Sequence, residues 1–166
     1  TANGISIISG GLNNQIGVSS ANNINLNNGY GISVSGASGN QLLNNVISTN
    51  SLGGIFISNS TGTVNGNTLT GNTGFGISTD GGTGNQITNN IVTTNNGGGI
   101  SLANGTGSVT GNTVTSNTGL GIFVNSSTSN QINNNSVRTN TSGGIVITNS
   151  TGNIGGNTVA GNFGNG

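Results

Sequence analysis

Asp80 and Arg138 are the only charged side chains in the sequence, so they are the first candidates for chemistry. Glycoside chemistry uses two carboxyl groups about 5 to 9.5 Å apart, and a calcium site needs six to eight oxygen ligands, so a single Asp satisfies neither requirement. Ser and Thr are abundant, but the sequence has no His, Lys or Cys to activate one of them as a nucleophile or to serve as one. We therefore predict no catalytic residue, no cofactor and no metal site, and expect a protein that is not an enzyme.

The elements that position these two residues come from a repeat. Seven Gly-Ile pairs recur in steps of 27 and then alternately 23 and 22 residues, and their glycines are Gly4, Gly31, Gly54, Gly76, Gly99, Gly121 and Gly144. A short and regular period is typical of a solenoid, in which each repeat forms one coil. Asp80 then falls in the turn after the first strand of one coil, and Arg138 in the third strand two coils later. Because coils stack about 4.8 Å apart, about 10 Å separates the two residues along the axis. We expect both to be solvated surface residues.

Four columns of aliphatic residues predict the strands. Alternation with a period of two places such residues on one face of a strand, and β-branched types favour strands. The first column is Ile5, Ile32, Ile55, Ile77, Ile100, Ile122 and Ile145, and the second is Ile7, Val34, Ile57, Thr79, Leu102, Val124 and Ile147. The third is Leu42, Val64, Ile87, Val109, Ile132 and Ile154, preceded by Ile16 or Val18, and the fourth is Ile24, Ile47, Leu69, Val92, Val114, Val137 and Val159.

These columns predict an all-β fold, a single-stranded parallel β-helix (β-solenoid) of about seven coils of 22–23 residues. Each coil holds three short strands, and the stack is about 34 Å tall. Residues 1–166 form one domain, in which 1–30 are an irregular first coil and 31–166 are regular coils with a 45-residue double repeat.

Two further columns consist of asparagine alone. The first is Asn22, Asn45, Asn67, Asn90, Asn112, Asn135 and Asn157, and the second is Asn27, Asn50, Asn72, Asn95, Asn117, Asn140 and Asn162. Stacked amides at strand spacing can hydrogen-bond along the axis, and Asn suits tight corners. We interpret the columns as structural ladders and not as a ligand site.

The composition also limits the partners. The sequence carries no net charge and has no basic patch for a nucleic acid, and no apolar run approaches the roughly 18 residues of a membrane-spanning helix. A surface without net charge does not repel its own copies. The expected partner is therefore the protein itself.

The repeat resembles a known family. Gly-Ile-x-Val/Ile, then Asn-x-Ile/Val and Gly-Asn-x-Val-x-x-Asn, looks like the right-handed parallel β-helix repeat of pectate-lyase-like and NosD-like proteins, alginate epimerase modules, phage tailspikes and large surface proteins. The resemblance covers essentially the whole chain and implies a right-handed coil, but the same coil carries many functions. Enzymes of this fold use clustered carboxylates with Arg, Lys, His or Tyr, often with calcium, and no such cluster can be carried over here.

A few apolar residues fall outside the four columns. Three follow the isoleucine of a Gly-Ile pair, where other coils carry Ser, and form a candidate lateral contact: Phe56, Phe123 and Val146. Three others precede the pair and alternate with glycine from coil to coil, which predicts core or corner filling: Tyr30, Phe75 and Leu120.

The function expected from this pattern depends on the open ends of the coil. Aliphatic residues of the end coils would be exposed there, and the candidate axial stacking residues are Ile5, Ile7, Ile145, Ile147, Val159 and Phe163. Heterologous stacking that does not close generates a filament. We expect a structural subunit of an extracellular or cell-surface fibre, filament or sheath, assembled head to tail from uncapped β-solenoids.

Three alternatives remain open. One is an ice-binding or surface-adhesive β-helix, because Thr68-Leu69-Thr70 and Thr113-Val114-Thr115 have suitable spacing, although the flanking coils do not repeat it. Another is a stalk segment of a large surface adhesin. A carbohydrate-binding module is disfavoured because outward Trp or Tyr platforms are lacking.

Overall fold

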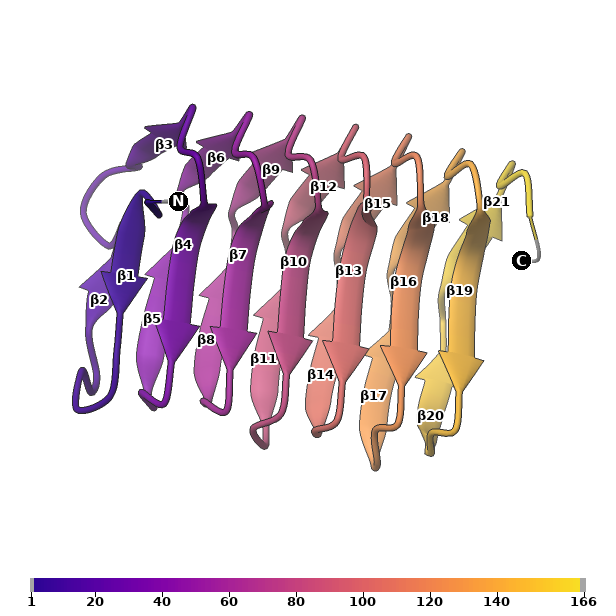
Figure 1. The fold of residues 1–166 in the computed structure, drawn as a ribbon. Coiled ribbons are helices and arrows are strands. Elements are labelled where there is room, and N and C mark those ends of the chain that lie inside the picture. The colour runs from indigo at the N-terminus through magenta and orange to yellow at the C-terminus, as the bar shows by residue number, and fades with distance from the viewer. Residues whose placement is uncertain (1, 165–166) are drawn as a thin grey trace.

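Short β-branched segments separated by glycine and asparagine stack into seven coils, each with three strands (Figure 1). The computed structural model describes residues 2–164, and within them every element is a strand, with no helix. The strands form three parallel sheets of seven strands each, and each sheet takes one strand from every coil. The all-β parallel solenoid predicted from the repeat is confirmed.

The first sheet holds the longest strands, and we call it the long-strand sheet. Its members begin at or near the Gly-Ile pairs and reach six residues because that segment is the most continuously aliphatic part of each coil. They are β1 (Ile5–Ile7), β4 (Tyr30–Ser35), β7 (Gly53–Ser58), β10 (Phe75–Asp80), β13 (Gly98–Ala103), β16 (Leu120–Asn125) and β19 (Gly143–Thr148).

The second and third sheets complete each coil. The second consists of β2 (Gln15–Ile16), β5 (Asn40–Leu43), β8 (Gly62–Asn65), β11 (Asn85–Thr88), β14 (Gly107–Thr110), β17 (Asn130–Asn133) and β20 (Gly152–Gly155). The third consists of β3 (Asn23–Asn25), β6 (Val46–Ser48), β9 (Thr68–Thr70), β12 (Ile91–Thr93), β15 (Thr113–Thr115), β18 (Ser136–Arg138) and β21 (Thr158–Ala160).

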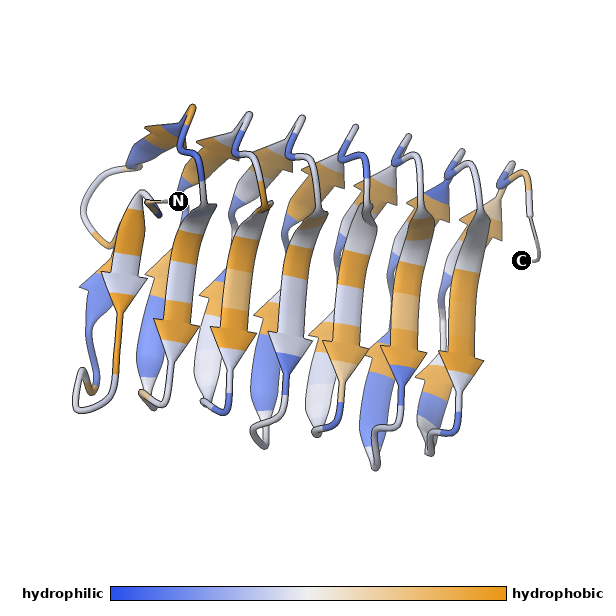
Figure 2. Ribbon diagram, in the orientation of Figure 1, coloured by the Kyte–Doolittle hydropathy of each residue, from blue (hydrophilic) through white to orange (hydrophobic). Residues whose placement is uncertain are grey.

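The strand register places like residues above one another. Ile77 lies between Ile55 and Ile100 in the long-strand sheet, and Val92 lies between Leu69 and Val114 in the third sheet. The apolar bands therefore recur at the same level from strand to strand (Figure 2). The four predicted columns form the core, with side chains such as that of Ile77 fully buried. Ile16, and not Val18, begins the third column, because Ile16 pairs with Leu42 while Val18 is 49% exposed.

The glycine of each Gly-Ile pair is required by close packing across the interior. A Cβ atom built on Gly99 would lie 2.2 Å from Cγ1 of Val114 and 2.4 Å from the carbonyl oxygen of Gly121. Real Cβ atoms do not approach other atoms so closely, so no larger residue fits without a shift of the coil. Gly99 thus lets the fourth aliphatic column pack directly against the backbone of the long-strand sheet.

The 45-residue double repeat has a steric origin. The ring of Tyr30 lies over Gly53 of the next coil, since a Cβ on that glycine would be 3.1 Å from the ring. Likewise the amide of Asn44, which has a φ of 57°, lies over Gly66 in the next coil. A 23-residue coil with large corner side chains therefore alternates with a 22-residue coil that carries glycine at the same corners. The ring of Tyr30 is half-buried, covers Gly53 and does not enter the core.

Candidate functional site

Asp80 and Arg138 lie apart, on different sheets and two coils from each other. Asp80 is the last residue of β10, so the expectation that it lies in the following turn is wrong by one position; its side chain accepts a hydrogen bond of 2.7 Å from Asn104 Nδ2. Arg138 ends β18, where its Nε donates to Ser136 Oγ at 3.2 Å. Both side chains are exposed. Each charge therefore has only a neutral side-chain partner, and the two do not form an acid–base pair.

The two predicted asparagine ladders are present, and in the middle coils each ladder Asn uses both of its side-chain hydrogens. Asn67 is buried, and its backbone N–H and its Nδ2 both donate to Oδ1 of Asn90, at 2.9 and 3.0 Å. The other Nδ2 hydrogen points back and donates to the carbonyl of Leu42 at 2.8 Å. The second ladder repeats this geometry, with Asn72 donating to Asn95 and to the carbonyl of Ile47. Within residues 2–164, no buried side-chain N or O atom lacks a hydrogen-bond partner.

Both ladders have a direction along the axis. The backbone N–H and one Nδ2 hydrogen of each ladder Asn in the middle coils donate to Oδ1 of the Asn in the following coil, so each of these Oδ1 atoms accepts from the preceding coil. In the last coil, the backbone N–H groups of Asn157 and Asn162 have no acceptor among residues 2–164, while their Oδ1 atoms accept from the preceding coil. In the first coil, Oδ1 of Asn22 and of Asn27 have no donor among the same residues. The C-terminal end face thus presents ladder donors and the N-terminal end face presents ladder acceptors.

The end coils also carry the exposed aliphatic surface. At the C-terminal end, Ile145 and Ile147 are half-buried, Val159 is 36% exposed and Phe163 is 81% exposed. Ile154, which was not among the predicted stacking residues, is 56% exposed and lines the same apolar hollow as Ile145, Ile147 and Val159. Its exposure could have been predicted from the sequence, because Ile154 is the last member of the third aliphatic column.

The N-terminal end is partly covered by its own longer coil. Ile5 is half-buried and lines a hollow with Ile16, but Ile7 is only 8% exposed. The segment after β1 covers it, because a Cβ on Gly11 would lie 2.7 Å from Cγ2 of Ile7. Ile7 therefore belongs to the core more than to the end face.

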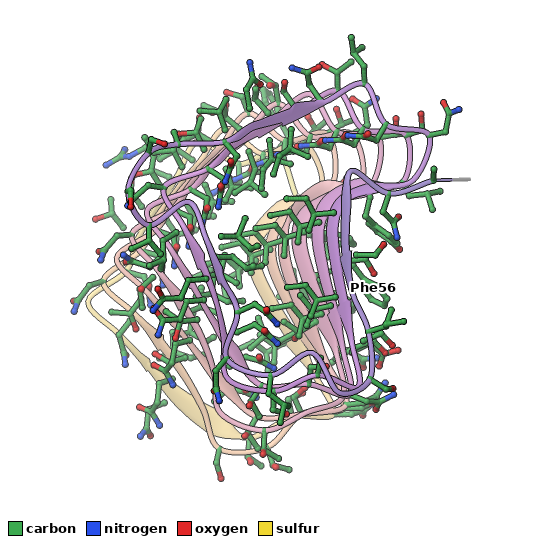
Figure 3. All side chains as sticks on the ribbon, turned by 90° about the vertical axis from the view of Figure 1, so that its left-hand side faces the viewer. Phe56 is labelled. Carbon is green, nitrogen blue, oxygen red and sulfur yellow. The ribbon has the colours of Figure 1, made fainter. Side chains whose placement is uncertain are left out.

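The outer face of the long-strand sheet gathers the other aromatic side chains. Phe56 points away from the interior (Figure 3), and its ring stacks on that of Tyr30 with centroids 4.8 Å apart and planes inclined by 18°. Phe75 reaches over Gly98 in the same way that Tyr30 reaches over Gly53. Tyr30 is thus half-buried against Phe56 on the outer face of the sheet and is not part of the core. The sequence signal for this contact was the alternation of Tyr30 with Gly53 at the position just before the Gly-Ile pair.

A third polar column at the corner between the first two sheets was not predicted as a ladder. Asn85 is buried, its Oδ1 accepts from the N–H of Gly62 at 3.0 Å, and its Nδ2 donates to the carbonyl of Ser60. Ser60 in turn accepts from the N–H of Ala37 at 2.9 Å. At this register position Asn alternates with Gly, as in the pair Asn85 and Gly107, and Ser60 lies two residues before it, so no column of uniform residue type reveals this corner.

Thr side chains do not form an unbroken array on the third sheet. Thr68 and Thr70 flank buried Leu69, and Thr113 and Thr115 flank buried Val114. In the strand between them, Ile91 occupies the position between Thr68 and Thr113 and is 49% exposed. This face is therefore a mixture of Thr and aliphatic side chains.

The comparisons with known proteins show the fold. Three solved structures of the periplasmic alginate epimerase AlgG are similar: a double mutant with a TM-score of 0.82 and 23% identity, the unsubstituted protein with 0.82 and 19%, and a single mutant with 0.77 and 18%. The matches cover 87%, 96% and 96% of this chain but only 35%, 47% and 47% of those chains, so this chain spans less than half of their length.

No curated protein matches the sequence. Among residues 2–164, no helix is long and apolar enough to cross a membrane. The family model described as "right handed beta helix region" matches residues 1–124 and 77–166, and together these matches span the chain. The chain therefore belongs to the right-handed β-helix family.

Proposed function

We propose that this chain is a non-catalytic, structural β-helix that assembles head to tail into an extracellular or cell-surface fibre, filament or sheath. Its partner at each end is another copy of the same solenoid. The observation that carries the proposal is the direction of the asparagine ladders, which leaves donors on one end face and acceptors on the other.

The two end faces match in position as well as in chemistry. Asn157 and Asn162 are five residues apart in the last coil, and Asn22 and Asn27 are five residues apart in the first. A copy stacked on the C-terminal face would let Asn157 donate to Asn22, and Asn162 to Asn27, as each coil already does to the next. The three sheets can be extended at the same time, because β19, β20 and β21 each have an unpaired edge within the described residues.

Apolar burial favours the same contact. The exposed aliphatic side chains at the C-terminal end, Ile154 and Val159, continue core columns that are fully buried in the middle coils. Burying apolar surface contributes about 25 cal/mol per Å², and the absence of net charge removes long-range repulsion between copies. Backbone pairing, ladder bonds and apolar burial would therefore act together.

The test uses one blocking substitution on each face. Ile154→Lys places a charge on the C-terminal face, and Ile5→Lys places one on the N-terminal face; the long Lys side chains can turn outward, so the coils still fold. Gln86→Lys is the matched control, since Gln86 is exposed on β11 in the middle of the stack. Sedimentation velocity and electron microscopy report the assembly state of each variant.

The blocked variants and the control all carry Phe56→Ser and Phe123→Ser, which remove the candidate lateral contact. In this background, head-to-tail stacking predicts that either blocked variant alone is monomeric, whereas an equimolar mixture forms a dimer through the two unblocked faces. The Gln86→Lys control should form filaments with a meridional repeat near 4.8 Å. Dimers of a single blocked variant in this background would indicate head-to-head contact and overturn the proposal. Isolated rods of the unsubstituted chain would also overturn it, and would favour a stalk whose end coils are covered by another part of a longer protein.

A further inference from the structure

The outer face of the long-strand sheet carries an apolar row that the axial contact does not use. Its members are half-buried and lie on β4, β7, β10, β16 and β19: Tyr30, Phe56, Phe75, Leu120, Phe123 and Val146. We call this set the aromatic row. It contains four of the five aromatic residues in the sequence, and the fifth, Phe163, lies on the C-terminal end.

The aromatic row combines two columns that pack against each other, one preceding each Gly-Ile pair and one following its isoleucine. Phe56, Phe123 and Val146 occupy the outward position that Ser33, Ser78 and Ser101 occupy in other coils. Tyr30 crosses Gly53 to stack on Phe56, at a centroid distance of 4.8 Å.

Phe75 crosses Gly98 toward the coil of Ser101, a residue that is only 9% exposed although it lies on the outward position. The side chains therefore form a preformed surface along the axis, with little rotamer freedom left to lose on binding.

We propose that the aromatic row is a lateral contact with a second copy of this chain, face to face on the long-strand sheets, so that neighbouring fibres pair side by side. The size of the face fits a pair of solenoids. Seven strands at about 4.8 Å spacing and six residues at about 3.3 Å each give about 29 by 20 Å, or nearly 600 Å² per partner. Two copies would bury about 1,200 Å², the lower limit of a stable specific interface.

The chemistry of the face also fits a second copy. Asp80, at one edge of β10, is the single charge on this sheet, and Arg138 lies on the third sheet, so pairing desolvates no charged cluster. The rest of the outward column is Ser, which packs at the 10 Å distance between two stacked sheets. The two partners present the same axial spacing of coils, so apolar and Ser positions can interdigitate along the whole length.

The lateral contact is tested where axial stacking cannot occur. In the background of Ile5→Lys and Ile154→Lys together, we substitute Phe56→Ser and Phe123→Ser, the residue found at the same register in neighbouring coils. The matched control is Val46→Ser with Ile91→Thr, which removes exposed aliphatic side chains from the third sheet instead. Analytical ultracentrifugation gives the dimer dissociation constant for each protein.

We expect the axially blocked protein to dimerise, the aromatic-row variant to bind itself at least tenfold more weakly, and the third-sheet control to be unchanged. A second measurement does not depend on removing side chains. The sequence has no cysteine, so Ser78→Cys, at the centre of the face, should give a disulfide-linked dimer on oxidation, and Thr93→Cys on the third sheet should not.

A monomeric axially blocked protein, or equal dissociation constants for the aromatic-row variant and the control, would overturn the proposal. The proposal would also be overturned if the axially blocked protein did not self-associate but bound a soluble neutral polysaccharide, and if the aromatic-row variant lost that binding. That result would assign the face to a glycan. None of these outcomes bears on head-to-tail stacking, because both end faces are blocked throughout.

Discussion

The side-chain amide of Asn67 donates a hydrogen bond of 3.0 Å to the side-chain oxygen of Asn90 in the next coil, and both residues are buried. Asn90 accepts a second hydrogen bond from the backbone N–H of Asn67 and donates both to the carbonyl of Val64 in the same preceding coil and to Oδ1 of Asn112 in the following coil. One side chain therefore connects three consecutive coils. The thin core of a solenoid makes such a connection a large share of the local stability.

Asn90→Ala should lower the free energy of unfolding by about 3 to 5 kcal/mol, because it leaves two buried donors of Asn67 without an acceptor, and each such group costs about 1–3 kcal/mol. Chemical denaturation followed by circular dichroism measures the change. The control is Asn96→Ala: Asn96 is exposed and bonds through its backbone N–H alone, so the change should stay within about 0.5 kcal/mol. Equal effects of the two substitutions would mean that the ladder is not a source of stability.

The repeat was sufficient to predict the three sheets and both asparagine ladders, because each position in the coil has one residue type and one environment. Asn45 and Asn67 share a column and a geometry, so a pattern in the sequence maps directly onto a pattern in space. The core columns follow for the same reason.

The prediction was less accurate where neighbouring coils differ. Tyr30 stacks on Phe56 of the next coil, and this contact depends on the gap left by Gly53, which only the three-dimensional register reveals. Ile7 was expected on the end face but is covered by the irregular segment after β1, whose path does not follow the repeat. The neighbour of Tyr30 comes from a coil of the other type, and the segment that covers Ile7 belongs to the one coil that departs from the repeat.

Gly99→Ala should destabilise the solenoid by about 1–3 kcal/mol or more, because the new Cβ would overlap Val114 and the carbonyl of Gly121. Differential scanning calorimetry would record this as a lower Tm. Gly155→Ala is the matched control, since Gly155 also lacks a positive φ and its nearest neighbour is a side-chain oxygen of Asn133 at 3.3 Å. A Tm that falls equally for both variants would show that the interior contact is not what requires glycine at 99.

Thr49→Gly should raise the stability by about 1 kcal/mol. Thr49 is exposed and has a φ of 56°, a left-handed conformation that is strained for a β-branched residue, whereas Gly71 occupies the same corner in the next coil at 64°. Thr68→Gly provides the contrast, because Thr68 is in strand β9, where glycine weakens the strand. Urea unfolding of both variants should give shifts of opposite sign, and a loss of stability in Thr49→Gly would contradict the strain assigned to this corner.

The chain should produce no thermal hysteresis in a freezing-point measurement. Ice binding requires a regular outward array, and the third sheet interrupts its Thr residues with Ile91, which is 49% exposed. Ice crystals grown with the protein should keep their unfaceted shape. Hysteresis that disappears in Thr113→Leu, a substitution on the outward side of β15, would instead assign an ice-binding role to this face.

Trypsin should cut the folded chain slowly, even though Arg138 is exposed and is its single cleavage site. The peptide after Arg138 lies at the end of β18, and its carbonyl accepts a hydrogen bond of 3.1 Å from the N–H of Ser116. A protease needs an extended, locally unfolded segment, so cleavage requires two coils to open. Thr83→Arg places a second site in the exposed turn between β10 and β11, and gel electrophoresis should show cleavage there first. Faster cleavage at Arg138 than at Arg introduced in that turn would show that the third sheet opens more readily than the corner of the coil.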